Sequence, residues 1–148
     1  MKGPRGVELL QGETITLAAS AARTAGANGT AMYVGGERER LLVLLNVTAS
    51  ATDAADTLDV YVDWSLDNIT WFNGGHFAQQ AGNGAAKKEY MIFDPSNPGT
   101  ASILVTSDAA AGAVRPAAFG VYLRARWAIA DSGDANQSHT FSVVAYAV

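Results

Sequence analysis

The sequence predicts an all-β fold, a single-domain antiparallel β-sandwich of jelly-roll-like type with about eight or nine short strands. Two stretches, Thr57–Phe72 and Phe119–Ala130, alternate apolar and polar residues as half-buried strands do. Clusters of Gly, Pro, Asn and Asp separate the apolar runs, as expected for turns. No stretch shows the amphipathic pattern of a helix, so we expect no helix of useful length.

The central element is a hairpin over Thr57–Phe72, which reads TLDVYVDWSLDNITWF. A period of two directs one set of side chains to a core and the other to water. The apolar set is Leu58, Val60, Val62 and Trp64. Turn-forming side chains follow over Ser65–Asn68, and β-favouring residues resume at Ile69. Two of the three tryptophans lie in this hairpin, so we expect it to supply much of the core.

Turn signals divide the rest of the chain into further strands and loops. The expected strands are Val7–Ala18, Ala31–Val34, Arg38–Ser50, Lys87–Phe93, Ala101–Thr106 and Ser138–Val148. The expected loops are Ala19–Thr30, Asp94–Gly99 and Ser107–Ala118, and Gly74-Gly75 is expected to form a bulge or kink.

The apolar run Leu41–Leu45 is continuous, which is typical of a strand covered on both faces. In an antiparallel sandwich one face is normally wet, so the second face needs a cover. That cover is either a second subunit or another part of the same chain, and the second alternative is the more common.

Composition excludes several classes of function. The net charge of -4 over 148 residues argues against nucleic acid as a partner, because phosphate binding needs clustered Lys and Arg. With no cysteine, the chain has no disulfide, thiolate metal site or cysteine nucleophile. We recognise no signal peptide or membrane-spanning stretch, so we expect a protein made in the cytoplasm, with no membrane partner.

Acidic residues suggest calcium only weakly. Asp53, Asp56, Asp59, Asp63 and Asp67 form a series without EF-hand spacing, and Asp131–Asn136 is similarly rich in oxygen. Solvated or arginine-paired strand faces explain such residues better, so we expect no metal and no cofactor. Arg124 and Arg126 are natural partners for these carboxylates if the two strands are neighbours.

Catalysis and sugar binding are also weakly supported. The chain has two histidines, His76 and His139, and no G-x-S-x-G elbow, so we expect no catalytic residue and no enzyme. Exposed aromatic residues could stack on sugars, with Tyr61, Phe72, Tyr90 and Tyr122 as candidates. Aromatic residues of small sandwiches belong more often to a core or an interface.

From about Leu17 to Val144, four landmarks are LAASAARTAGANGTAMYVGG, LLVLLNVTAS, TLDVYVDWSLDNITWF and YLRARWAIADSGDANQSHTFSV. In these landmarks the chain resembles small structural proteins of tailed bacteriophages, including the decoration (cement) proteins outside the capsid. Within the third, Ser65–Trp71 is also similar to the Asp-box hairpin of sialidases, although it lacks the glycine. The Asp-box is a structural turn, so this second similarity implies a hairpin only.

The phage resemblance implies a protein of the virion exterior, commonly a homotrimer, that binds the major capsid protein and stabilises the shell by bridging capsid subunits. The alternative is a tail or fibre module that binds a carbohydrate or another receptor. We expect residues 1–6 to form a flexible arm and residues 7–148 the sandwich. The expected subunit contacts are Leu42, Leu44, Tyr61, Tyr122, Arg124 and Arg126. The expected capsid contacts are Lys2, Arg5, Val7, Val114 and Arg115.

Overall fold

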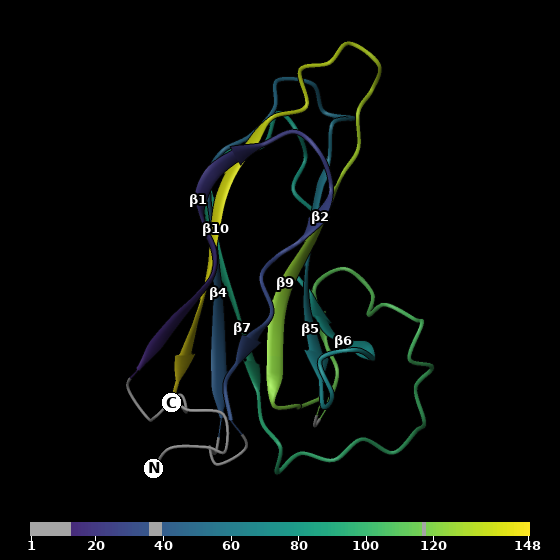
Figure 1. The fold of residues 1–148 in the computed structure, drawn as a ribbon. Coiled ribbons are helices and arrows are strands. Elements are labelled where there is room, and N and C mark those ends of the chain that lie inside the picture. The colour runs from purple at the N-terminus through teal and green to yellow at the C-terminus, as the bar shows by residue number, and fades with distance from the viewer. Residues whose placement is uncertain (1–12, 36–39, 117) are drawn as a thin grey trace.

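The computed structural model describes residues 13–35, 40–116 and 118–148, which form two antiparallel sheets and no helix (Figure 1). The strands of these residues are β1 Thr14–Arg23, β2 Ala27–Asn28, β3 Met32–Tyr33, β4 Leu41–Ala49, β5 Leu58–Ser65, β6 Trp71–His76, β7 Lys87–Phe93, β8 Ala113–Val114, β9 Tyr122–Ile129 and β10 His139–Ala147. The all-β sandwich prediction is therefore confirmed. Within the described ranges no helix is present that could cross a membrane.

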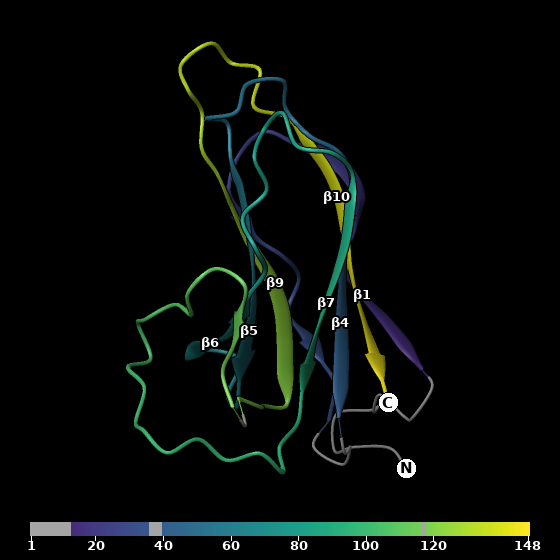
Figure 2. The same ribbon diagram turned by 180° about the vertical axis from the view of Figure 1, so that it is seen from behind.

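The two sheets lie face to face, and the chain crosses between them repeatedly. One sheet has four strands in the order β1-β10-β4-β7. The other has six, in the order β2-β9-β5-β6-β8, with β3 also pairing with β9. Figure 1 shows the four-stranded sheet on the left and the six-stranded sheet on the right, and Figure 2 shows them from behind. Spatial neighbours such as β4 and β7 are therefore distant in the sequence.

The core lies between the sheets and follows the alternation in the sequence. β4 buries Leu41, Val43, Leu45 and Val47, and β5 buries Leu58, Val60, Val62 and Trp64. Trp64 joins the layers: its ring meets Phe93 of β7 edge-on at 5.3 Å and stacks on Phe119 at 4.7 Å, both between ring centroids. Aromatic pairs at such distances add to the stabilisation from area burial alone.

The central hairpin is confirmed, and it contains the expected bulge. The register between β5 and β6 shifts between Val62 and Asp63, opposite the two glycines of β6. A Cβ on Gly74 would lie 2.6 Å from the Trp64 ring, so position 74 has space for glycine only. The bulge therefore lets β6 pass close to the largest buried side chain.

Several predicted elements differ from the structure: the predicted loop Ala19–Thr30 contains the end of β1 and all of β2, and the predicted loop Ser107–Ala118 contains β8. The first strand does not end at Ala18, because β1 pairs with β10 as far as Arg23 opposite His139. Arg23 also donates hydrogen bonds to the carbonyl oxygens of Ala19 and Phe141, at 2.6 and 2.8 Å. Residues 7–12 of that predicted strand, like the predicted arm 1–6, lie outside the described residues.

The predicted strand Ala101–Thr106 does not form, and all its residues are exposed. At this side of the six-stranded sheet β6 pairs with β8 instead. The described strands number ten rather than eight or nine, because three of them, β2, β3 and β8, are only two residues long. Such short pairings carry little sequence signal.

Candidate functional site

The outer side of the four-stranded sheet carries six apolar or aromatic side chains, here called the apolar face: Leu42, Leu44, Tyr90, Ile92, Val144 and Tyr146. They form two rows across three strands. Leu42 lies between Tyr146 and Ile92, and Leu44 lies between Val144 and Tyr90. Because their sequence neighbours in β4, β7 and β10 include the buried core residues, these six point away from the core.

The apolar face is open to solvent in the described structure. Tyr90 is 64% exposed and Ile92 is 43% exposed, while the other four side chains are half-buried among their neighbours. Figures 1 and 2 show no further layer of described chain outside this sheet. The continuous run Leu41–Leu45 is thus buried on one side, and no described segment covers its other side. An uncovered group of apolar side chains of this kind makes the apolar face a candidate interaction surface.

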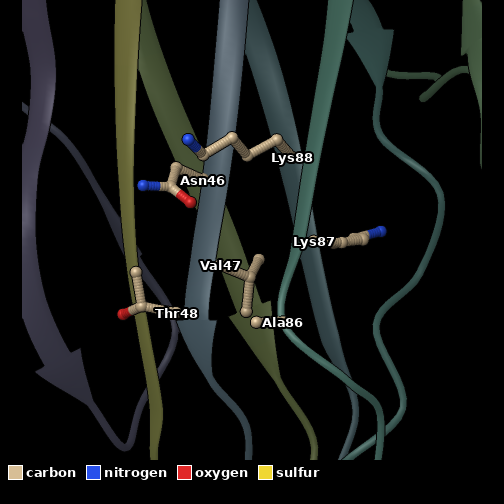
Figure 3. A pocket seen from close by; sticks show the side chains of 6 residues that line it. All are labelled: Asn46, Val47, Thr48, Ala86, Lys87 and Lys88. Carbon is tan, nitrogen blue, oxygen red and sulfur yellow. The ribbon is translucent and has the colours of Figure 1, made fainter.

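Polar residues border the apolar face at one end. The next row places Asn46 between Ser142 and Lys88. A shallow depression of about 440 Å³ lies there, lined by Asn46, Val47, Thr48, Ala86, Lys87 and Lys88. Figure 3 shows Lys88 extending across β4 toward Asn46, whereas Lys87 points away. Lys87 is bonded instead to Glu89 at 3.0 Å. An apolar centre with a polar border is the usual anatomy of a protein–protein interface.

The outer side of the six-stranded sheet is chemically different. We call it the arginine–aromatic face, and it comprises Tyr61, Asp63, Trp71, His76, Arg124 and Arg126. Its rows follow the strand register: Tyr61 lies between Arg126 and His76, and Asp63 is opposite Arg124. The pairing of β5 with β9 thus brings the predicted acidic and basic partners together.

Cations and rings on this face stack on one another. The Arg126 guanidinium carbon lies 4.0 Å from the centroid of the Tyr61 ring. The His76 ring stacks on Tyr61 with 4.1 Å between centroids. Arg124 lies 4.2 Å from the centroid of a Trp71 ring. The ring of Tyr61 is therefore occupied by its own chain on two sides, which leaves no free ring face there for a sugar.

Asp63 is the electrostatic centre of the arginine–aromatic face. Its side chain is 3% exposed, and its Oδ2 accepts hydrogen bonds from Arg126 Nε at 2.8 Å and Arg124 at 3.3 Å. Burial disfavours the charged form of Arg126, but hydrogen bonds to Asp63 and Asp108 outweigh burial and raise its pKa. Burial, and then the charge of Asp59, raise the pKa of Tyr61, which keeps this phenol neutral. The cluster is a compensated, rigid network.

The same face anchors the long connection from β7 to β9. Asn73 is buried, its Oδ1 accepts from Ala109 N at 2.9 Å, and its Nδ2 donates to Asp63 at 3.1 Å. His76 bonds Ala109 O at 3.0 Å through Nδ1 and Asp59 at 2.8 Å through Nε2. These contacts hold the connection, the green loop beyond β6 in Figure 1, against the six-stranded sheet.

The predicted contact residues separate into groups. Leu42 and Leu44 lie on the apolar face, whereas Tyr61, Tyr122, Arg124 and Arg126 lie on the outer side of the other sheet. Tyr122 is half-buried and meets Tyr33 edge-on, with 5.4 Å between centroids. Whether any of these residues meets another copy of the chain stays a prediction.

Of the predicted capsid contacts, Lys2, Arg5 and Val7 lie outside the described residues. Val114 is 38% exposed in β8. Arg115 donates to the carbonyl of Asn73 and to the Ser107 hydroxyl, both at 3.0 Å, so it holds the loop in place.

Sequence reasoning missed half of the apolar face as well as an apolar part of the long connection. Ile92, Val144 and Tyr146 were detectable from the alternation in Lys87–Phe93 and Ser138–Val148, and Tyr90 was considered only for sugars. Residues Ile103, Leu104 and Val105, assigned to a strand, are 49%, 75% and 52% exposed. They border a cavity of about 190 Å³ together with Phe72 and Pro116.

Reactive groups are few in the described part of the chain. The ring nitrogens of His76 are bonded to Asp59 and Ala109, and Nε2 of His139 is bonded to the carbonyl of Asp56. Within the described residues, neither histidine is therefore hydrogen-bonded to a hydroxyl group. One group of three carboxyls, from Asp53, Asp56 and Asp134, has the separation that a metal ion requires.

No family model matches this chain, and neither the curated proteins nor the solved structures contain a significant match.

Proposed function

We propose that this protein is a decoration (cement) protein of a tailed bacteriophage. It binds the outside of the capsid as a homotrimer and stabilises the shell by bridging neighbouring major capsid subunits. The observation that carries the proposal is the open apolar face of the four-stranded sheet, and the phage role comes from the resemblance described under the sequence. Such a protein is made in the host cytoplasm and needs no catalytic site, cofactor, nucleic acid or membrane.

The apolar face supports contacts between copies of this chain. Stable interfaces combine an apolar centre with a polar border, and Leu42 and Leu44 lie at the centre of the six-residue face, with Lys88 at its border. The six apolar side chains are neighbours in two rows, so they form a continuous surface rather than scattered exposed residues. Burying Tyr90 and Ile92 against another copy would remove the two most exposed members from water.

The long connection supports contact with the capsid. It is fixed at Ala109 and Arg115, yet it exposes Ile103, Leu104 and Val105 between those anchors and the end of β7. A fixed loop with an apolar tip loses little conformational entropy on binding. The proposal therefore assigns the capsid contact to this loop, with Val114 nearby, and the copy–copy contact to the apolar face.

The glycan-binding alternative has less support. Stacking on a sugar needs a free ring face, whereas Tyr61 and Trp71 already stack with residues of their own chain. Tyr90 does have a free ring, but its neighbours across the sheet are Leu44 and, through it, Val144. Sugar sites combine rings with several polar groups that bond hydroxyls, and beside Tyr90 this row has Leu44 and Val144, with Thr16 beyond them on β1.

The first test is the mass in solution, by size-exclusion chromatography with light scattering. Trimers give about three times 15.4 kDa. The variant Leu44→Glu places a charge in the centre of the apolar face and is expected to give monomers. Ile69→Glu, at an 82% exposed position in the hairpin turn, is the matched control and is expected to remain trimeric.

The second test uses heads of the phage that encodes the chain, stripped of this protein. Added protein is expected to co-sediment with the stripped heads and to raise the temperature at which they release DNA. Binding to a glycan array without binding to heads would instead establish the alternative. Heads that neither bind the protein nor gain heat resistance would rule out the decoration role.

A further inference from the structure

Three carboxyls meet at the end of the sandwich where the chain crosses between the sheets. Asp53 and Asp56 lie in the β4–β5 connection, and Asp134 lies in the β9–β10 connection. One oxygen of each carboxyl lies within 4.8 Å of one oxygen of each of the others. These two connections lie beside each other at the top of Figure 1, and Figure 2 shows the same from behind.

Asp56 gives this cluster a feature that exposed acidic groups lack. The residue is fully buried, and its Oδ2 has no hydrogen-bond partner. Its Oδ1 accepts a hydrogen bond from Ser132 N at 2.5 Å. Among the ion pairs of the described residues, none involves Asp53, Asp56 or Asp134. A buried carboxylate oxygen without donor or cation is costly, and two further carboxyls nearby increase that cost.

We propose that Asp53, Asp56 and Asp134 bind one Ca²⁺ ion, with the free Oδ2 of Asp56 as a ligand. Calcium takes six to eight oxygen ligands at about 2.4 Å, so two of its ligands lie at most about 4.8 Å apart. The three carboxyls satisfy this limit. Every atom that the three carboxyls offer to a metal ion is an oxygen, which suits calcium better than zinc or copper.

Asn136 and Thr52 can supply further oxygens. Asn136 Nδ2 lies 3.0 Å from Asp53, 3.1 Å from Asp134 and 3.2 Å from the Thr52 hydroxyl. This amide takes the place of a cation among the carboxyls. Turning the amide over presents its oxygen to an ion in the same position, with water completing the coordination.

The site connects the two sheets. Each of its two connections passes from one sheet to the other, so an ion held by both fixes the sheets to each other at this end. Binding to the folded chain alone raises its stability in proportion to the logarithm of the Ca²⁺ concentration. The inference stands independently of the decoration role.

Isothermal titration of the full chain, first freed of metal with EDTA, tests the site with CaCl2. We expect one ion per chain and a rise in melting temperature of about 5 °C at 10 mM CaCl2. The variant Asp134→Asn, at an exposed position, is expected to weaken Ca²⁺ binding about tenfold or more. In EDTA the same variant is expected to melt at or above the temperature of the unmodified chain, because a carboxyl repulsion is removed.

Two further variants make the result decisive. Asp56→Asn keeps the acceptor for Ser132 N and is expected to abolish Ca²⁺ binding. Asp131→Asn, in the same connection but outside the cluster, is expected to bind Ca²⁺ as the unmodified chain does. The proposal is overturned if 10 mM CaCl2 gives neither heat nor a melting shift, if Mg²⁺ binds as tightly as Ca²⁺, or if Asp134→Asn retains full affinity.

Discussion

The two outer faces of the sandwich are built by the same alternation of residues, yet they differ in what their side chains do. On the apolar face, Leu42 and Leu44 have only other apolar side chains beside them. On the arginine–aromatic face, Asp63, Arg124 and Arg126 are bonded to one another within the chain. The side chains of the apolar face form no ion pair or side-chain hydrogen bond among themselves, whereas those of the arginine–aromatic face are bonded to one another.

This difference shows why residue type alone does not identify an interface. Arginine and tyrosine are enriched at interfaces, which made Tyr61 and Arg126 reasonable candidates. The charge of Arg126 and the ring of Tyr61 also let these residues stack and form ion pairs within their own chain when the strands bring them together. The half-buried Leu42 and Leu44 can form no such network, so their position on the uncovered side of a sheet is the more informative observation.

Removing Asp63 should have the largest effect on stability. Asp63→Ala leaves two guanidiniums without their shared carboxylate, and we expect a loss of about 3 kcal/mol in the free energy of unfolding, measured with urea. Asp108→Ala is the matched control, because Asp108 bonds the same Arg126 from a side chain that is 42% exposed. Its loss should be about 0.5 kcal/mol. Equal losses would show that the arginine–aromatic face is not an integrated network.

Asn73 should have the next largest effect. Asn73→Ala removes a buried amide that bonds Asp63 and Ala109, and we expect a loss of about 2 kcal/mol. The connection from β7 to β9 should then be cleaved faster in limited proteolysis. Asn97→Ala, at an exposed position of that connection, should change neither quantity. Unchanged proteolysis in Asn73→Ala would mean that the loop is held elsewhere.

The salt dependence of association shows, without any substitution, which of the two faces forms the contact between copies. Association through the apolar face should not weaken when NaCl rises from about 0.1 to 1 M, because exposed charges are screened at high salt while apolar burial is not. Sedimentation equilibrium at both concentrations measures this. Dissociation at high salt would move the subunit contact to the arginine–aromatic face.

The smallest effect concerns the turn that joins β5 to β6. Hydrogen bonds from the backbone of Ile69 and Thr70 lower the pKa of Asp67 to about 2. Because this pKa lies below the value of about 3.9 in an unfolded chain, the stabilisation is present above about pH 4 and is lost as the pH falls through 2. Between pH 5 and pH 2, the melting temperature of Asp67→Asn should therefore fall less than that of the unmodified chain. An identical loss in both proteins would contradict this assignment.

The fold was largely predictable, because alternation is a local property of the sequence. The hairpin Leu58–His76, its bulge and the strand Lys87–Phe93 all follow from residues close together in the chain. The run Ala101–Thr106 looked equally suitable as a strand, but it joins neither sheet, and β6 pairs with β8 instead. Which strands pair depends on the rest of the fold, so the sequence could not show it.

The surfaces were only partly predictable for the same reason. The pairing of Asp63 with Arg124 and Arg126 was anticipated as a condition on strand order, and β5 and β9 meet that condition. The union of Asp53 and Asp56 with Asp134 depends on two connections that lie far apart in the sequence. Each half looked like an ordinary polar turn, and only the fold brings the halves together.

The position of β10 has a consequence for the order of events during synthesis. This strand lies between β1 and β4, although the ribosome makes it after every other described strand. Val144 and Tyr146 of β10 complete both rows of the apolar face. A nascent chain therefore cannot complete either row before β10 has left the ribosome, so the apolar face forms only after all the described strands have been synthesised.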